Sequence, residues 1–375
     1  MTLVRQIIDR GAAHGLSLYR ASPRGTDRLV LEFRDRDGAV IAGQWHRDPE
    51  RGAATARRTA MASPRGSFDV TVLDRPDLFV QRRGADRRLP ALAQLANRQG
   101  SLLVSHRAER RGVVRLADGD FVKVVPPEKV AAVVTGCSVT SANPSLALPR
   151  VVGVDPESGT VTTAAMSGRT LESRLTDSNL SDDELVTDAK AVGAALREFH
   201  EEGPLPTALP RHDTAAELAV TERWLNAATG FGLVDPDRWT STLARAVDLL
   251  DERPTDPVRV HRDLHDKQLV LEVDQPVGLL DLDLVTSGEA AVDIANLLVH
   301  LELRHRLGGC TTTRAERCAE AFLTGYAPTE PTLARIGGYM TTTRLRLAGV
   351  YAFRDSPQGL LDDLVDSCFE KGLPS

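Results

Sequence analysis

The sequence predicts an α+β fold in which strands dominate the N-terminal half and helices dominate the C-terminal half. Apolar runs typical of strands occur at 29–33, 39–45, 113–116 and 121–125, with turn residues between them. Farther along the chain, apolar residues recur at helical spacing over 186–199. With 375 residues, of which 42% are apolar, the chain can bury a large core, and its length predicts two or three domains.

Residues 1–100 are predicted to form an N-terminal β-rich cap domain of mixed α/β composition. The region begins with an amphipathic helix, and the strand-like runs at 29–33 and 39–45 flank an Asp-Gly turn. The apolar residues of the helix lie at helical spacing: Val4, Ile7, Ile8 and Ala12. We therefore expect a small structural unit before residue 101.

Residues 101–168 are predicted to form a second, compact β lobe. Two strand-like runs, 113–116 and 121–125, flank an Asp-Gly-Asp turn, which is a strong hairpin signal. Lys123 stands in the second of these strands. An extended segment at 159–168 then leads to the helical part of the chain.

Residues 169–375 are predicted to be mainly helical, with a β-hairpin at 268–283. An Asp-Gln-Pro turn joins the two apolar runs of this hairpin, so that its acidic ends come together. Residues 345–353 belong to one predicted helix. Another helix has the apolar stripe Val186, Ala189, Val192, Leu196 and Phe199.

A polar loop precedes this hairpin and carries the most informative motif of the chain. It reads His261-Arg262-Asp263-Leu264-His265, then Gln268, and the carboxylates of Asp281, Asp283 and Asp293 follow. Phosphoryl transfer needs one carboxylate to orient and deprotonate a hydroxyl, and others, with an amide oxygen, to hold magnesium on nucleotide phosphates. The order of groups, and the five-residue step from Asp263 to position 268, match the kinase signature H-R-D-L-x-x-x-N.

The combination of HRDLH, the hairpin, the run LLDLD and a later Gly288 resembles the aminoglycoside phosphotransferase family of small-molecule kinases. This resemblance implies a protein-kinase-like bilobal fold, with a β-rich nucleotide lobe, a mainly helical C-terminal lobe and an extra N-terminal α/β cap. The nucleotide lobe and hinge would be residues 101–168, and residues 169–375 would be the C-lobe with the catalytic loop. The cap is similar to the extra N-terminal unit of some sugar kinases, such as maltokinases.

The resemblance implies roles for individual residues of the loop. Asp263 matches the catalytic base, His261 the histidine that braces the loop, and His265 the second histidine of the family's catalytic loop. Asp281 matches the magnesium-binding aspartate, and Asp293 the helix-start aspartate that ties down the loop. Both histidines have an equally good reading as packing or hydrogen-bonding residues, and neither is expected to act as a base.

Two further positions are candidate metal ligands. Gln268 departs from the family, which has asparagine there, and the extra methylene moves the amide oxygen by about 1.5 Å. Asp283 is either a second metal contact or a residue that lies beside Asp281 because both project from one strand face.

Lys123 matches the lysine that reaches the nucleotide phosphates, whereas the nearby Lys129 is expected to be a solvated helix residue. The usual glutamate partner of this lysine is Glu128, or else the pair is absent or made differently. A glycine-rich loop is missing. In its place a basic turn either contacts phosphate or is simply solvated: Arg107, Arg110 and Arg111.

The segment 159–168 matches the hinge whose backbone hydrogen-bonds the nucleotide base in related kinases. The base is accordingly expected beside Ala164, Ala165 and Met166, although a methionine here also fits the core.

Composition limits the partners and the setting. The net charge of −6 provides no basic field for nucleic acid. Four cysteines without a CxxC pair, no cleavable signal and no long apolar stretch predict no membrane contact and a cytoplasmic protein. A C-terminal acidic series either binds the ammonium groups of an aminoglycoside or forms a solvated face: Asp355, Asp362, Asp363, Asp366 and Glu370.

These observations predict a phosphotransferase that uses ATP and Mg²⁺ to transfer the γ-phosphoryl group to a hydroxyl of a small molecule, such as a sugar, an aminoglycoside or another natural product. Two alternatives stay open at this point. One is a pseudokinase that binds without catalysis, and the other is a tailoring enzyme that acts on serine or threonine of a biosynthetic peptide. The sequence leaves the acceptor and the oligomeric state open.

Overall fold

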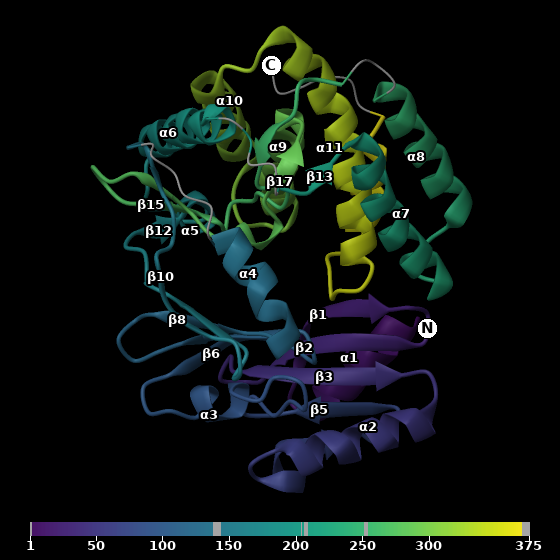
Figure 1. The fold of residues 1–375 in the computed structure, drawn as a ribbon. Coiled ribbons are helices and arrows are strands. Elements are labelled where there is room, and N and C mark those ends of the chain that lie inside the picture. The colour runs from purple at the N-terminus through teal and green to yellow at the C-terminus, as the bar shows by residue number, and fades with distance from the viewer. Residues whose placement is uncertain (1, 138–143, 204, 206–208, 251–253, 370–375) are drawn as a thin grey trace.

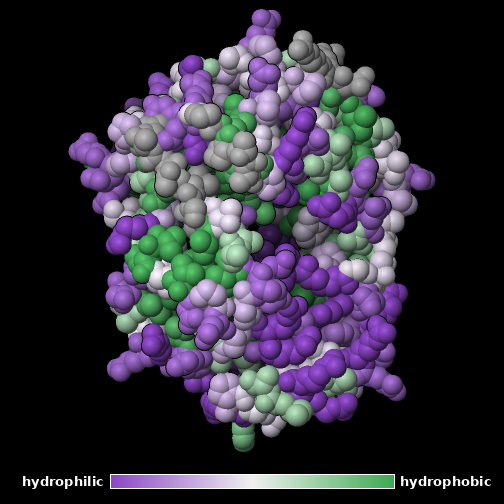
Figure 2. All heavy atoms as spheres, in the orientation of Figure 1, coloured by the Kyte–Doolittle hydropathy of each residue, from purple (hydrophilic) through white to green (hydrophobic). Residues whose placement is uncertain are grey.

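The computed structural model describes residues 2–137, 144–203, 205, 209–250 and 254–369. The β-rich part and the helical part lie one above the other, with helix α4 (Val130–Cys137) between them (Figure 1). Viewed from the same side, the surface is hollowed near its centre, between the two parts (Figure 2). The predicted α+β class is confirmed, with strands concentrated before residue 164 and helices after it.

The N-terminal unit is an antiparallel sheet of order β1-β2-β3-β5-β4, which makes β1 an edge strand. Helix α1 (Leu3–Ala13) packs on this sheet through Val4 and Ile7, as its apolar spacing predicted. The predicted strands at 29–33 and 39–45 are confirmed as β2 and β3. The elements of this unit are β1 (Ser17–Arg24), β2 (Arg28–Arg34), β3 (Val40–His46), α2 (Pro49–Ala62), β4 (Val70–Val72) and β5 (Leu78–Gln81).

A second antiparallel sheet, of order β10-β11-β8-β7-β6, continues the β-rich part. The predicted hairpin is confirmed: β7 pairs with β8, and Val113 lies opposite Lys123. The two sheets are linked at Glu32, which is buried and accepts a hydrogen bond from the His106 backbone N–H at 3.0 Å. The elements are α3 (Leu92–Ala96), β6 (Leu102–Arg107), β7 (Arg111–Arg115), β8 (Phe121–Val124), β10 (Val151–Asp155) and β11 (Thr160–Thr163).

The helical part has a large apolar core of its own, which includes the predicted stripe of α6 from Ala189 to Phe199. The predicted helix at 345–353 is the end of α11, which stops at Tyr351, and Phe353 is buried just beyond it. Across the described ranges, no helix combines the length and apolarity needed to cross a membrane. The helices are α5 (Leu171–Leu175), α6 (Asp182–Glu201), α7 (Thr214–Gly230), α8 (Pro236–Leu249), α9 (Ala290–Arg306), α10 (Thr312–Tyr326), α11 (Glu330–Tyr351) and α12 (Leu360–Asp366).

Two small sheets lie within the helical part and carry the candidate site. The predicted hairpin is confirmed, because β15 pairs with β16 and Leu269 lies opposite Leu279. The orders are β12-β15-β16-β9 and β13-β17-β14. Their strands are β9 (Leu146–Ala147), β12 (Arg169–Thr170), β13 (Arg211–His212), β14 (Val258–Val260), β15 (Leu269–Leu271), β16 (Val277–Leu279) and β17 (Thr286–Gly288).

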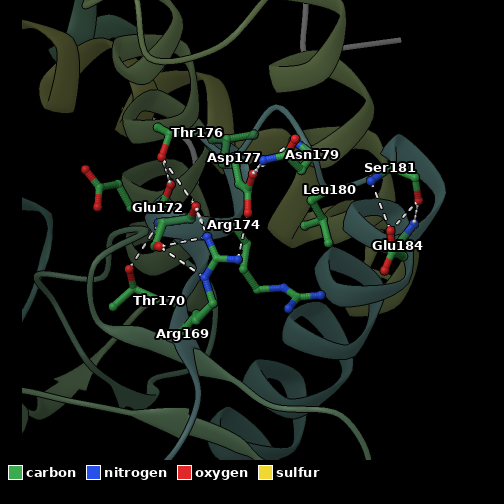
Figure 3. Close-up of polar contacts among 12 residues, drawn as sticks. Arg169, Thr170, Glu172, Arg174, Thr176, Asp177, Asn179, Leu180, Ser181 and Glu184 are labelled. Carbon is green, nitrogen blue, oxygen red and sulfur yellow. Dashed lines mark hydrogen bonds and ion pairs between the residues drawn. The ribbon is translucent and has the colours of Figure 1, made fainter.

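The first helices after the connection between the two parts are fixed by local hydrogen bonds (Figure 3). Arg169 donates to the Ser173 carbonyl at 2.9 Å and pairs with Asp177 at 2.8 Å. Helix α6 begins with a capping box, in which Ser181 and Glu184 each satisfy the other's backbone N–H. This network defines where the helical part begins.

The N-terminal unit is not a separate appendage, because it shares its core with α7 and α11. The Ala21 backbone N–H of β1 donates to the Phe353 carbonyl at 3.1 Å. The Phe231 ring packs edge-on against both Trp45, at 6.0 Å, and Phe353, at 5.5 Å. These contacts hold the edge strand β1 against the end of α11. The boundary at residue 100 stays a prediction.

Candidate active site

The catalytic-loop motif follows β14 and is anchored at its start by Asp293 of α9. The fully buried Asp293 carboxylate accepts hydrogen bonds from the backbone N–H groups of His261 and Arg262, both at 2.6 Å. It also lies 3.1 Å from Nε2 of His200. These contacts fit the role predicted for Asp293, because they hold the backbone at the start of the loop in place.

Arg262 has a left-handed backbone conformation, with φ of 71°. A residue with a Cβ destabilises this conformation by about 1–2 kcal/mol, so the surrounding structure must hold it. The Asp293 carboxylate holds the Arg262 N–H, and the Asn296 side chain donates to its carbonyl at 2.9 Å. The strained residue directly precedes Asp263 and turns the loop there.

Asp263 presents its carboxylate to a cavity. Its side chain is 43% exposed, and Nη1 of Arg346 approaches its Oδ1 to 3.9 Å. At that distance the pair is loose, and the carboxylate keeps room for a hydroxyl donor. Asp263 thus has the accessibility that a proton acceptor needs.

The two histidines of the motif hold the loop from inside. His261 is fully buried, and its Nε2 lies 2.8 Å from the Leu280 carbonyl, directly before Asp281. Nδ1 of His265 accepts a hydrogen bond from the Lys267 N–H at 3.2 Å. Burial lowers the pKa of His265, which favours a neutral ring at pH 7. These contacts fit bracing roles for both residues.

Lys123 and the two aspartates after the hairpin meet across the two lobes. Nζ of Lys123 lies 2.9 Å from Asp281 Oδ1 and 2.7 Å from Asp283 Oδ2. Arg111 approaches the same two carboxylates to 3.5 and 3.6 Å. Burial opposes ionisation, but the facing charges outweigh it: they lower the pKa of Asp281 and raise the pKa of Lys123.

The alternative explanation for the proximity of Asp281 and Asp283, a shared strand face, is wrong. Strand β16 ends at Leu279, Asp281 has a left-handed backbone with φ of 58°, and Asp283 lies in a short 3₁₀ turn. The chain therefore bends at Asp281, and the two carboxylates converge because both contact Lys123.

The groups around this bend fit a magnesium ion. The side-chain oxygen of Gln268 and Oδ1 of Asp283 are buried, and neither has a hydrogen-bond partner among the described residues. Two carboxylates and an amide oxygen are ligands that magnesium prefers. In the described part of the chain, no group of three His, Cys, Asp or Glu side chains could hold a metal. Magnesium is usually held by one or two carboxylates together with water and substrate phosphates, so Asp281 and Asp283 fit it, and the Gln268 oxygen is a further candidate ligand.

Glu128 does not pair with Lys123 in this structure. Its exposed carboxylate contacts Arg88, and Lys123 is paired with Asp281 and Asp283 instead. The prediction that Glu128 is the partner of Lys123 is therefore wrong. The alternative prediction, that Lys123 forms its ion pair with a different residue, agrees with the structure. Lys129 is exposed, as expected.

The predicted hinge follows β11 and already uses two of its backbone donors. The Ala164 N–H donates to the Arg150 carbonyl at 2.9 Å, and the Ala165 N–H donates to Asp120 at 3.1 Å. A nucleotide base bound by these two groups would have to replace those acceptors. The Met166 side chain packs over Gly278 of the hairpin, which is the core contact considered for it.

A cavity of about 1300 Å³ contains the loop and extends toward the N-terminal unit. It corresponds to the hollow between the two parts of the molecule (Figure 2). Its walls come from β1, the β6–β7 turn, α7, α9 and α11. The three arginines of the basic turn line it: Arg107, Arg110 and Arg111.

The predicted acidic series divides between two places. Asp355 lines the cavity, whereas Asp362 and Asp366 pair with Arg238, both at 2.5 Å. Asp363 is exposed on the same short helix, and Glu370 lies outside the described residues. The series therefore does not form one acidic surface on the cavity.

Several residues of the site escaped the sequence interpretation. Asn296 holds the Arg262 carbonyl, and Arg346 donates to Asn296 at 2.7 Å. The buried Glu217 lies 3.6 Å from Arg346 and 2.7 Å from His212. Asn296 had a signal, since it follows Asp293 by three residues on one helix face. Arg346 and Glu217 had none.

Several solved structures are similar to this chain. The aminoglycoside phosphotransferase APH(3'')-Id from Streptomyces rimosus is 20% identical, with a TM-score of 0.48 over 66% of this chain and 93% of that chain. A choline/ethanolamine kinase family protein from Mesorhizobium loti is 17% identical, with a TM-score of 0.49 over 75% and 91%. A glucosamine kinase is 17% identical, with a TM-score of 0.45 over 94% and 93%. No curated protein matches the chain.

The family comparison gives the identification. The model of the phosphotransferase enzyme family matches residues 81–339, which is well over half of the chain and includes Lys123, the catalytic-loop motif, Asp281 and Asp283. This match confirms the resemblance inferred from the catalytic-loop motif, and with it the protein-kinase-like bilobal fold. The chain belongs to the phosphotransferase enzyme family.

Proposed function

We propose that this protein is a kinase that uses ATP and magnesium to phosphorylate a hydroxyl group of a small molecule. The observation that carries the proposal is the meeting of Lys123, from the β-rich lobe, with Asp281 and Asp283 beside the loop of Asp263. Phosphoryl transfer depends mainly on positioning and charge, and this arrangement combines a cation, clustered carboxylates and an accessible carboxylate. Membership of the phosphotransferase enzyme family supports the same reaction class.

The proposed nucleotide side consists of Lys123, Arg111 and the two aspartates, and of these Arg111 and Asp281 line the cavity. Magnesium, when bound, supplies positive charge to the phosphates. Asp281, Asp283 and the buried amide oxygen of Gln268 are its proposed ligands. Lys123 and Arg111 are the cations available to phosphate oxygens on this side.

Asp263 is the proposed general base. It accepts the proton of the acceptor hydroxyl as the hydroxyl oxygen bonds to the γ-phosphorus, the bond to the bridging oxygen breaks, and the nucleoside diphosphate leaves. Asp293 and His261 do not touch the reactants and act as positioning residues. Asp293 fixes the loop N–H groups, and His261 links the loop to the Leu280 carbonyl.

The test is turnover of Mg-ATP with a pooled panel of sugars, aminoglycosides and peptides, followed by mass spectrometry of the acceptors. Asp263→Asn keeps the shape of the side chain and removes its basicity, so turnover should fall by about 10²–10⁴. Asp274→Asn in the exposed hairpin turn is the matched control, because Asn tolerates the left-handed backbone there. Unchanged turnover in Asp263→Asn would refute the role of Asp263.

A pseudokinase, which uses this fold as a binding or scaffold module without catalysis, is the second candidate. Two observations favour it: Glu128 is paired with Arg88 instead of Lys123, and the N–H groups of Ala164 and Ala165 already have acceptors. Failure to bind Mg-ATP at millimolar concentration would support this candidate, whereas binding with no product would point to an acceptor outside the panel. Phosphate on peptide hydroxyls, with sugars inert, would instead identify a peptide-tailoring enzyme.

A further inference from the structure

The charge of the cavity is opposite to that of the whole chain. Among the described residues that line it, eleven are arginine or lysine and five are aspartate or glutamate. The chain as a whole has a net charge of −6. A basic cavity in an acidic protein favours ligands with negative charge, because concave walls concentrate the field of their side chains.

The basic residues are not all neutralised inside the protein. Six cavity arginines have a buried guanidinium nitrogen without a hydrogen-bond partner among the described residues: Arg20, Arg24, Arg107, Arg111, Arg346 and Arg354. Three of these nevertheless face a carboxylate, namely Arg20, Arg111 and Arg346, whereas Arg24, Arg107 and Arg354 form no ion pair with a described carboxylate. A buried donor without a partner destabilises a protein, because it loses its hydrogen bonds to water without replacement. Donors of this kind at one cavity indicate a bound group that accepts hydrogen bonds.

Arg24 and Arg354 line the cavity from β1 and from the segment after α11, which contact each other. Arg24 ends β1, and the hydrogen bond from Ala21 to Phe353 holds β1 beside the segment that carries Arg354. Among the described residues, neither arginine forms an ion pair with a carboxylate. Arg354 is held by its own turn, where its guanidinium stacks at 4.4 Å on the Tyr351 ring.

The electrostatics of Arg24 and Arg107 show an excess of positive charge, although Glu109 acts on Arg24 and Glu32 on Arg107 in the opposite sense. Burial and the facing charges of Arg110 and Arg28 lower the pKa of Arg24 to about 10. Burial and the charges of Arg20, Arg111 and Arg110 lower the pKa of Arg107 to about 9. Cations that face one another in this way are stabilised by an anion between them.

The position of Arg354 assigns this part of the cavity to the acceptor. The nucleotide side is marked by Lys123 and Asp281, whereas Arg346 of α11 approaches Asp263. Arg354 follows Arg346 by eight residues, in the direction of the N-terminal unit. An acceptor with its hydroxyl at Asp263 therefore extends toward Arg354 and Arg24.

We propose that the acceptor is an anionic hydroxyl compound, a phosphorylated sugar or a sugar acid, whose oxyanion binds Arg24 and Arg354. The inference rests on the proposed function, since it names the acceptor of that reaction. It gives the N-terminal unit a role as one wall of the acceptor site. It also argues against a polycationic aminoglycoside, because among the described acids of the C-terminal series only Asp355 lines this cavity.

Calorimetric binding tests the inference on the full-length protein. Binding of magnesium with a non-hydrolysable ATP analogue is measured first, and its failure would count against the proposed function alone. Glucose 6-phosphate, glucuronate, glucose and kanamycin are then titrated with and without the analogue. We expect binding of one or both anions and at least tenfold weaker binding of glucose and kanamycin. The two anions distinguish a phosphate site from a carboxylate site.

Variants locate the binding. Arg24→Gln and Arg354→Gln should each weaken binding of the anion by about 10-fold or more, since a hydrogen bond to a charged group contributes about 1.5–3 kcal/mol. Arg57→Gln, on the exposed face of α2 away from the cavity, is the matched control and should leave binding unchanged. Affinity for the nucleotide analogue should stay the same in all three variants. Failure of both anions to bind, preferential binding of kanamycin, or unchanged affinity in both cavity variants would overturn the inference.

Discussion

The proposed nucleotide and acceptor ends of the site differ in whether their basic side chains are paired with carboxylates. At the nucleotide end, Lys123 and Arg111 face Asp281 and Asp283, so the cations and carboxylates neutralise one another. At the acceptor end, Arg24 and Arg354 have no carboxylate partner among the described residues. An internal ion pair must open before its members can bind a ligand, whereas an unpaired cation is ready for an anion.

This difference has a consequence for ligand binding. At the nucleotide end, Lys123 now occupies the two carboxylates that are proposed to hold magnesium. Magnesium and phosphate together can replace that arrangement, because the metal takes the carboxylates and the phosphate takes the lysine. We therefore expect nucleotide and metal to bind cooperatively at the nucleotide end. At the acceptor end, the anion should bind without first breaking an ion pair inside the protein.

Removal of the lysine should have the largest effect. Lys123→Met leaves Asp281 and Asp283 close together without their main cation, so turnover should fall by about 100-fold or more, and the protein should lose about 1–3 kcal/mol of stability. Thermal unfolding with and without magnesium checks the cause. Magnesium should raise the Tm of the variant more than that of the wild type, because the carboxylates are then free. Lys129→Met is the exposed control, and an equal effect of magnesium on all three proteins would contradict the exchange.

Loss of the amide oxygen should have the next largest effect. Gln268→Leu removes a buried oxygen that has no partner in the described structure, so stability should change little. If this oxygen is a ligand, the magnesium concentration for half-maximal turnover should rise by about tenfold. Gln268→Asn restores the family's residue and serves as the control with an amide. Equal magnesium requirements in wild type and Gln268→Leu would remove Gln268 from the metal site.

A carboxylate introduced at the acceptor end should make it resemble the nucleotide end. Ser22 lines the cavity two residues before Arg24, so the two side chains share a strand face. Ser22→Asp should weaken binding of glucose 6-phosphate several-fold, because the anion then competes with an internal counter-ion. Ser17→Asp, at an exposed position of the same strand, is the control. Tighter binding of the anion by Ser22→Asp would contradict the comparison.

The pH dependence of stability should show the smallest effect. Ion pairing lowers the pKa of Asp281 in the folded protein, so its stabilisation is present above the unfolded pKa of about 3.9 and is lost as the pH falls through the folded value. The pKa of Lys123 is raised, so its contribution is present below about pH 10.4 and is lost as the pH rises farther. Asp281→Asn should accordingly lower the Tm near pH 6 and reduce its decline toward pH 3. A Tm difference between variant and wild type that is the same at both pH values would contradict this linkage.

Local patterns predicted much of the fold. The apolar spacing of α1 and α6, the hairpins β7–β8 and β15–β16, and the strands β2 and β3 were all predicted from short windows of sequence. Each depends on contacts between residues that are close in the chain, or on a face that must be buried. The catalytic-loop motif is local in the same sense, so the order of Asp263, Gln268 and Asp281 sufficed to indicate the family.

Contacts between distant segments could not be predicted in this way. The sequence suggested Glu128 as the partner of Lys123. In the folded protein Lys123 pairs with Asp281 and Asp283 instead. Glu128 pairs with Arg88. A spacing rule describes one helix or one strand pair, and it contains no information on which lobe surfaces meet. The turn of the backbone at Asp281 decided the outcome, because it points both carboxylates toward the lysine.

The sequence by itself determined the reaction class, since the chemical groups for phosphoryl transfer occur in the family's order along the chain. Only the tertiary structure decided the character of the acceptor end. Arg24 and Arg354 come from opposite ends of the sequence, and they line one cavity because β1 packs against the end of α11. The physical reason is that side-chain chemistry is encoded residue by residue, whereas the field of a cavity depends on which side chains the packed core brings together.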